Sequence, residues 1–228
     1  MPGLGLSVTL WEVTEQNSIQ SIDAQTIINN EDAFPGRVIR NSAGVITEVD
    51  STLVNFGTIN VRGFDYQVNW KHPIGLGVVE TSMAATQTYQ YLTSLLPGLA
   101  PQDRVSQAST DLNWAPRWKG VARASWTQGP LSAGVDGRYT GKYRDYLPLP
   151  DGAYQTLGNF WIFDVNAKMS LKTPGWISAV VPHADLEIGA VNALNRLPQY
   201  SNNPYIGYDG TQADIRGRFL YVKLGVRW

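Results

Sequence analysis

Apolar and polar positions alternate along the last twelve residues of the chain, from Gly217 to Trp228. Successive side chains of a β-strand point to opposite faces, so this segment is predicted to be a strand with one wholly apolar face. A half-buried strand of a soluble sheet gives the same alternation, so this strand alone leaves both settings open. The apolar row consists of Leu220, Val222, Leu224, Val226 and Trp228.

The same period of two recurs in several segments upstream, and the charged residues of each segment fall on one parity. Within 160–172, for example, Trp161, Phe163 and Val165 alternate with Asp164 and other polar residues. A lipid-facing wall around a wet lumen requires this segregation. We therefore predict an all-β fold, an antiparallel transmembrane β-barrel segment of about eight strands. The expected strands cover residues 4–13, 57–71, 75–89, 116–128, 131–144, 160–172, 184–194 and 217–228.

The connections between these strands alternate between short and long. Those around 71–75 and 127–131 are tight, and the one at 173–183 is intermediate. The long connections are 14–56, 90–115, 145–159 and 195–216. Outer-membrane barrels have short periplasmic turns and longer external loops, so both chain ends are expected on the periplasmic side. The first long loop is expected to hold a short helix capped by Asp23 and a hairpin around Asn41–Gly44.

Several aromatic residues fall near the ends of the expected strands rather than in their middles. Aromatic girdles at the two headgroup levels of a membrane barrel have this placement, whereas core aromatics of a soluble sandwich are expected centrally. The girdle candidates are Trp70, Trp118, Trp126, Tyr143, Phe160, Trp161 and Trp228.

Composition and charge narrow the function classes further. The formal net charge is -1 and no Lys/Arg tract stands out, so a nucleic-acid partner is not expected. The chain has no cysteine, which excludes disulfides, thiolate metal sites and a cysteine nucleophile. No run of about 18 apolar residues and no signal peptide occurs, so a membrane role requires strands and Met1 is interpreted as a truncation point.

Candidate catalytic and metal-binding groups are sparse. His72 and His183, the two histidines, fall in predicted turns far apart in the sequence, and no metal site is expected. The carboxylates of Asp185 and Glu187 are interpreted as part of a solvated barrel wall rather than as a general acid and base. Ser7, Ser125 and Ser170 lie in expected strands without a nucleophile elbow. We predict no enzyme and no cofactor, with a barrel-embedded lipase or protease as a formal alternative.

Three segments together resemble the carboxy-terminal half of the barrel of TonB-dependent outer-membrane receptors. NFGTINVRGFDYQVNW contains the Gly63 to Tyr66 opening of a long barrel strand. EIGAVNALNRLPQY is similar to the Asn-Leu-Phe-Asn segment of these receptors, with Asn192, Leu194 and Asn195 in the corresponding places. RGRFLYVKLGVRW resembles their closing strand, although Trp228 stands where most members have Phe.

The resemblance implies that residues 1–228 form part of a barrel of about 22 strands, without the plug domain and the earlier strands. The full-length parent is then expected in the outer membrane, importing an iron chelate, a cobalamin or a glycan. Its implied partners are outer-membrane lipid and lipopolysaccharide, the barrel-assembly machinery, the TonB complex through the missing plug region, and the small-molecule or glycan ligand.

The resemblance also implies roles for particular residues. Ligand contacts are expected in the external loops and the upper lumen, where the candidates are Arg144, Tyr146, Tyr154, Tyr200, Tyr205 and Tyr208. The apolar row that ends at Trp228 is expected to act as the barrel-assembly signal. Two other readings remain open at this point: a complete eight-stranded barrel with a structural or adhesive role, and a soluble β-sandwich binding module.

Overall fold

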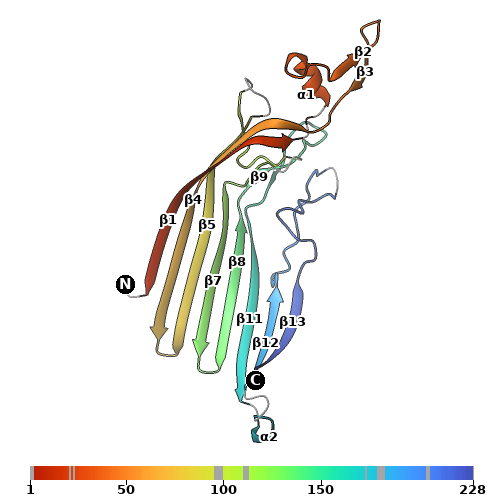
Figure 1. Cartoon of the computed structure of the whole chain (residues 1–228). Coiled ribbons are helices and arrows are strands. Elements are labelled where there is room, and N and C mark those ends of the chain that lie inside the picture. The colour runs from red at the N-terminus through yellow and green to blue at the C-terminus, as the bar shows by residue number, and fades with distance from the viewer. Residues whose placement is uncertain are drawn as a thin grey trace.

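The structure is a computed structural model that describes residues 3–20, 22, 24–94, 100–109, 113–172, 174–178, 183–203 and 206–227. Eight long strands form one antiparallel sheet in the order β1-β4-β5-β7-β8-β11-β12-β13 (Figure 1). The predicted all-β, antiparallel fold is confirmed. The strands are β1 (Leu4–Gln20), β4 (Val54–Ile74), β5 (Gly77–Ser94), β7 (Trp118–Gln128), β8 (Leu131–Thr140), β11 (Phe160–Lys172), β12 (His183–Val191) and β13 (Phe219–Arg227).

Short connections lie at one end of the sheet and long connections at the other, as predicted. Only Gly75–Leu76 separates β4 from β5, and Gly129–Pro130 separates β7 from β8. The short helix α2 (Gly175–Ser178) lies between β11 and β12. Figure 1 shows that β1 begins and β13 ends at the short-turn end of the sheet. None of the helices among the described residues is long and apolar enough to cross a membrane.

The first long connection folds into a small projection beyond the sheet (Figure 1). The predicted helix and hairpin are confirmed, while Asp23, the expected cap, lies outside the described residues. The projection has an apolar core of its own, formed by Ile22, Ile27 and Phe34 with Val38 and Val49 against them. Its elements are α1 (Ala24–Asn29), the 3-10 helix η1 (Glu31–Ala33), β2 (Val38–Arg40) and β3 (Ile46–Val49).

Strand register assigns each side chain to one of two faces. Directly paired residues of antiparallel strands point to the same side, so a row of partners across the sheet marks one face. The row Tyr66–Ala85–Gly120–Tyr139–Trp161 belongs to what we call the apolar face. The neighbouring row Asp65–Thr86–Lys119–Thr140–Phe160 belongs to the polar face. The segregation predicted from the period of two is therefore present across the sheet.

Aromatic side chains mark both ends of the apolar face. Tyr66 lies 5.7 Å from Trp118, and Tyr139 lies 5.1 Å from Trp161, near the long loops. Trp70 and Trp126 lie on the same face near the short turns. Phe160, grouped with this girdle on sequence, is on the polar face because it pairs with Thr140 rather than Tyr139.

The strands β1, β4 and β5 extend farther than the sequence pattern predicts. The connection expected at 14–56 begins only after Gln20, and the one expected at 90–115 begins after Ser94. Above Leu10 the apolar face becomes polar, where Arg62 pairs with Glu12 at 2.8 Å. The backbone ladder continues past this level although the apolar row has ended, so periodicity could not locate the strand ends.

Strand β8 is shorter than predicted. Gly141 makes the last bond to β7, from its N–H to the Trp118 carbonyl at 2.8 Å, and the chain then leaves the sheet. Tyr143, expected on the lipid-facing parity, is instead buried in β9 (Tyr143–Arg144), which pairs with β10 (Thr156–Leu157). The alternation predicted from the sequence ran past the true end of β8, so it assigned the Tyr143 side chain to the wrong environment.

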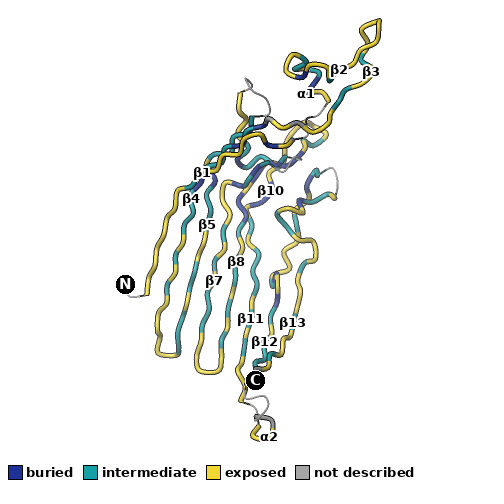
Figure 2. The backbone as a smooth tube through the Cα atoms, viewed as in Figure 1, coloured by how far each residue is buried: buried dark blue, intermediate teal, exposed yellow. Residues whose placement is uncertain are grey.

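The sheet is open. In the described part of the chain, β1 is hydrogen-bonded to β4 on one side, and β13 to β12 on one side. The two-residue strand β6 (Gln102–Asp103) pairs with β5 beside the long-loop end. Figure 2 shows exposed positions recurring along the strands, whereas buried positions gather near the long loops.

Candidate functional site

Cross-strand ion pairs cover much of the polar face. Lys71 pairs with Glu80 at 2.5 Å and Lys168 with Asp185 at 3.2 Å, each from one strand to the next. Arg123 pairs with Asp136 and Arg138 with Asp164 in the same manner. Each such half-exposed pair contributes only about 0.2–1 kcal/mol. Their main consequence is a charge-balanced surface suited to water.

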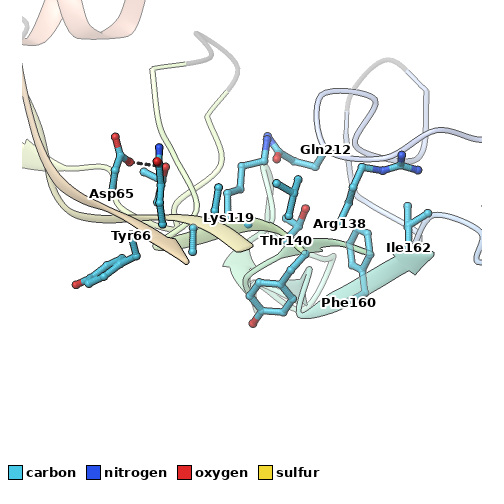
Figure 3. Close-up of a pocket in the computed structure, with 15 residues that line it drawn as sticks. Asp65, Tyr66, Lys119, Arg138, Thr140, Phe160, Ile162 and Gln212 are labelled. Atoms are coloured by element: carbon cyan, nitrogen blue, oxygen red, sulfur yellow. Dashed lines mark hydrogen bonds between the residues drawn. The ribbon is translucent and has the colours of Figure 1, made fainter. Parts of the chain in front are cut away.

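A hollow of about 510 Å³ opens on this face, with side chains from β4, β5, β7, β8 and β11 around it. Figure 3 shows Asp65, Lys119 and Arg138 on the side opposite to Tyr66. Asp65 accepts a hydrogen bond from the Thr86 hydroxyl at 2.7 Å. The hollow is also lined by Gln212, which belongs to the connection between β12 and β13. A distant loop thus reaches the polar face.

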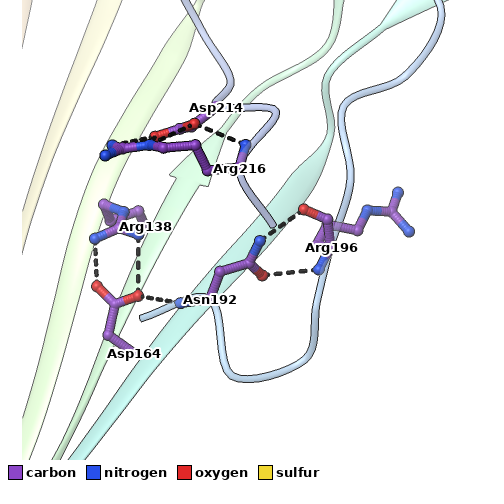
Figure 4. Close-up of polar contacts among 6 residues, drawn as sticks. All are labelled: Arg138, Asp164, Asn192, Arg196, Asp214 and Arg216. Carbon is purple, nitrogen blue, oxygen red and sulfur yellow. Dashed lines mark hydrogen bonds and ion pairs between the residues drawn. The ribbon is translucent and has the colours of Figure 1, made fainter. Parts of the chain in front are cut away.

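A turn after β12 ties three strands together below this loop (Figure 4). The Asn192 N–H donates to Asp164 Oδ1 at 2.7 Å, so one carboxylate serves both this turn and Arg138. The Asn192 side chain closes the turn through two bonds to the Arg196 backbone, and Asn195 Oδ1 accepts from the Arg218 N–H at 3.0 Å. One of the three segments that carry the family resemblance therefore forms a structural turn that links neighbouring strands.

A second cluster, which we call the loop knot, joins the long connections. Its centre is Asp145, whose side chain is fully buried. The carboxylate accepts four hydrogen bonds, from the Ser201 hydroxyl at 2.6 Å, Gln155 Nε2 at 2.7 Å, and the Asn202 and Tyr146 N–H groups at 2.7 and 2.8 Å. A buried carboxylate is stable only with such partners. Asp145 therefore links two loops that are distant in the sequence, since Ser201 follows it by 56 positions.

Aromatic side chains form the apolar part of the loop knot. Trp114 lies 4.8 Å from Tyr143 and 6.2 Å from Tyr146. The Tyr146 hydroxyl donates to Asp209 Oδ1 at 3.1 Å. Burial raises the pKa of the Tyr143 phenol, and the negative charge of Asp209 raises that pKa further. Burial raises the pKa of the Tyr146 phenol as well, so both phenols stay protonated.

The structure places the predicted ligand-contact residues in different environments, some buried and some exposed. Tyr146 is buried in the loop knot, whereas Arg144 lies 4.3 Å above the ring of exposed Tyr154. Tyr200 is exposed and Tyr208 is half-buried, and Tyr205 lies outside the described residues. Tyr146 is thus unavailable at the surface, which its sequence context did not reveal.

Sequence reasoning missed the residues that organise both clusters. Asp145 and Ser201 are isolated polar residues in different loops, so no local signal relates them. Lys119 falls on the charged parity of 118–126 with Arg123, and that parity did not single it out as a site residue. Gln212 gave no signal, because loop positions have no periodicity to assign them a face.

The apolar row of the last strand is largely exposed. Leu220, Val222, Leu224 and Val226 all belong to the exposed large apolar residues, while Trp228 lies outside the described residues. On the other side of this strand, the Tyr221 hydroxyl donates to Glu187 Oε1 at 2.8 Å. The strand therefore divides into an apolar and a polar face, as its alternation predicts.

Both histidines lie in strands, contrary to the prediction of turns. His72 belongs to β4 and stacks on Trp70 with 5.0 Å between the ring centres, and His183 begins β12. Among the described residues, no group of three or more His, Cys, Asp or Glu side chains is arranged to hold a metal ion.

The geometry is that of a wall with one apolar and one polar face, topped by interlocked loops. The family model described as TonB dependent receptor-like, beta-barrel matches residues 2–195. Among curated proteins, none matches the chain.

Proposed function

The chain belongs to the TonB-dependent receptor-like β-barrel family, and from this premise we propose that it is the carboxy-terminal part of a larger receptor barrel. Members of this family are receptors and transporters of the outer membrane. The full-length parent takes up a scarce nutrient, such as an iron chelate, a cobalamin or a glycan. An enzymatic role is not part of this proposal.

The open sheet is the observation that supports the larger barrel. Strands β1 and β13 each have a hydrogen-bonded neighbour on one side only, among the residues described. Free backbone groups are not tolerated in the hydrocarbon core of a membrane, so each edge requires a further strand. An eight-stranded barrel would instead pair β1 with β13. The open edges therefore favour earlier strands from the parent.

The same arrangement supports the proposed partners. The exposed apolar face, bounded by aromatic residues, suits outer-membrane lipid, and the polar strand tops suit lipopolysaccharide. The polar face borders the lumen, where a plug domain connects the parent to the TonB complex. Exposed Arg144, Tyr154 and Tyr200 remain candidate contacts for a small-molecule or glycan ligand.

The proposal can be tested with antibodies against the projection formed by residues 22–53. We expect them to detect, in outer membranes of the source cells, a polypeptide much larger than this chain. A heat-modifiable band of this chain's own mass would instead support a closed eight-stranded barrel. A band of that mass in the soluble fraction would support a soluble sandwich.

The last strand is proposed to be the signal for the barrel-assembly machinery. Its support is the exposed row Leu220, Val222, Leu224 and Val226 beside an unpaired edge. We expect Trp228→Asp in the full-length parent to reduce outer-membrane assembly, while Arg227→Gln, as a neighbouring control, retains it. Undiminished assembly of the Trp228→Asp variant would argue against the signal.

A further inference from the structure

The hollow on the polar face has an apolar floor, which is unusual for a wall that faces water. The row Gln67–Ala84–Val121–Arg138–Ile162 crosses the polar face, and its middle is apolar. Val121 is 52% exposed there. Elsewhere on this face, charged residues of neighbouring strands pair with each other. An exposed apolar floor in a wet lumen gains free energy when an apolar group covers it.

Charge in the hollow is unbalanced at one position. Lys119 is exposed at its rim, and no acidic group among the described residues forms an ion pair with it. The carboxylate of Asp65, the nearest acid along its row, accepts the Thr86 hydroxyl instead. Arg138, the other cation of the hollow, is already paired with Asp164. Lys119 is therefore the cation free to bind an anionic group.

The loop above the hollow supplies an unused acceptor. Gln212 Oε1 is buried and has no hydrogen-bond partner, while its Nε2 donates to the Thr211 hydroxyl at 3.1 Å. That hydroxyl in turn donates to Asp209, so it has no proton to offer Gln212. A buried acceptor without a donor costs roughly 1–3 kcal/mol. Because Oε1 has almost no accessible surface, a bound molecule that carries a donor would remove this cost once the Gln212 side chain turns toward the hollow.

We propose that the hollow binds a small molecule with an anionic group next to a compact apolar body and a hydrogen-bond donor. The anion lies at Lys119, the apolar body covers Val121 and Ile162, and the donor meets Gln212 Oε1 when that side chain turns toward the ligand. The volume of about 510 Å³ falls in the range of small-molecule sites. The inference rests on the proposed receptor function and adds the ligand's chemical class to it.

The test uses three probes of known chemistry on the full-length parent assembled in the outer membrane, with affinity measured by calorimetry. 4-Hydroxybenzoate combines an anion, a ring and a donor; 4-hydroxybenzyl alcohol lacks the anion; acetate lacks the ring. We expect 4-hydroxybenzoate to bind about tenfold or more tightly than either. A hydrogen bond to a charged group exceeds a neutral one by about that much, and acetate has no ring to cover the apolar floor. Equal affinities for all three would overturn the proposal.

Matched variants locate the binding. Lys119→Gln should weaken 4-hydroxybenzoate about tenfold and leave 4-hydroxybenzyl alcohol unchanged. Lys223→Gln, which removes another lysine of the polar face outside the hollow, should change neither. An equal loss in both variants, or no loss in Lys119→Gln, would overturn the assignment.

Heat-modifiable migration of the same preparations separates this inference from the receptor proposal. Protein that assembles as a barrel in the outer membrane yet binds no probe defeats the ligand site alone. A full-length parent that fails to enter the outer membrane defeats the proposed function.

Discussion

Side chains such as Leu6 and Val222 on the apolar face of the sheet are 70% and 73% exposed, whereas Tyr143 and Leu157 in the loop knot are 3% and 4% exposed. The knot has its own core and satisfies its buried carboxylate internally, as a soluble domain does. The sheet leaves its apolar residues outside and therefore requires lipid to cover them. One chain thus contains two regions whose stability depends on different surroundings.

Removing Asp145, the centre of the loop knot, should give the largest effect and should destabilise the loops while the sheet stays intact. Asp145→Ala leaves four donors without their acceptor, so we expect the knot to lose about 4 kcal/mol, at roughly 1 kcal/mol for each donor. Native-state hydrogen exchange should show the loops opening while the sheet keeps its protection. The matched control is Asp151→Ala, an exposed aspartate of the same loop that accepts one bond from the Ala153 N–H. Equal effects of both changes would refute the central role of Asp145.

The opposite experiment acts on the sheet and spares the knot. Leu6 lies between the Trp70 level and the Phe64 level of the apolar face, so Leu6→Lys in the full-length parent places a charge within the bilayer. We expect a loss of about 3 kcal/mol in lipid vesicles, measured by urea unfolding. Ser7→Lys, one residue along the same strand but on the polar face, should cost much less. Similar losses for both would contradict the assignment of the faces.

Asp164 connects the sheet to the turn beneath the loops, so its removal should have an intermediate effect. Asp164→Ala breaks the ion pair with Arg138 and also the bond from the Asn192 N–H, and we expect about 1.5 kcal/mol of destabilisation. Asp136→Ala breaks the comparable pair with Arg123. In thermal unfolding of the assembled protein, Asp164→Ala should have a lower Tm than Asp136→Ala. The reverse order would show that the turn does not depend on this carboxylate.

The sequence allowed the sheet to be predicted because strand side chains alternate with a fixed period. It identified eight strands and the short and long connections, and it placed Trp118 and Trp161 on the apolar face. It failed where the chain leaves the lipid-facing band, because the ladder of β1 continues to Gln20 after the apolar row has ended. The same limit explains Tyr143, whose parity continued a strand that stops at Thr140.

The loop knot and the hollow could not be predicted, for a different reason. Asp145 meets Ser201 across 56 positions, and Gln212 reaches the face that carries Lys119 from another loop. Such contacts depend on how separate loops pack, and polar residues in loops carry no periodic signal. The family resemblance implied that tyrosines in the loops bind ligand, yet it could not distinguish buried Tyr146 from exposed Tyr200.

The smallest expected effect concerns pH and the connection between β12 and β13. Hydrogen bonds from the Arg216 side chain, followed by one from its N–H, lower the pKa of Asp214 from 3.8 to about 2. A carboxyl whose pKa is depressed on folding stabilises the folded state above its unfolded pKa. That contribution is lost as pH falls from about 4 towards 2. Protease cleavage of this connection should therefore rise across that window, and Asp214→Asn should remove the dependence. A variant that keeps the same pH profile would show that Asp214 is not the group that controls cleavage of this connection.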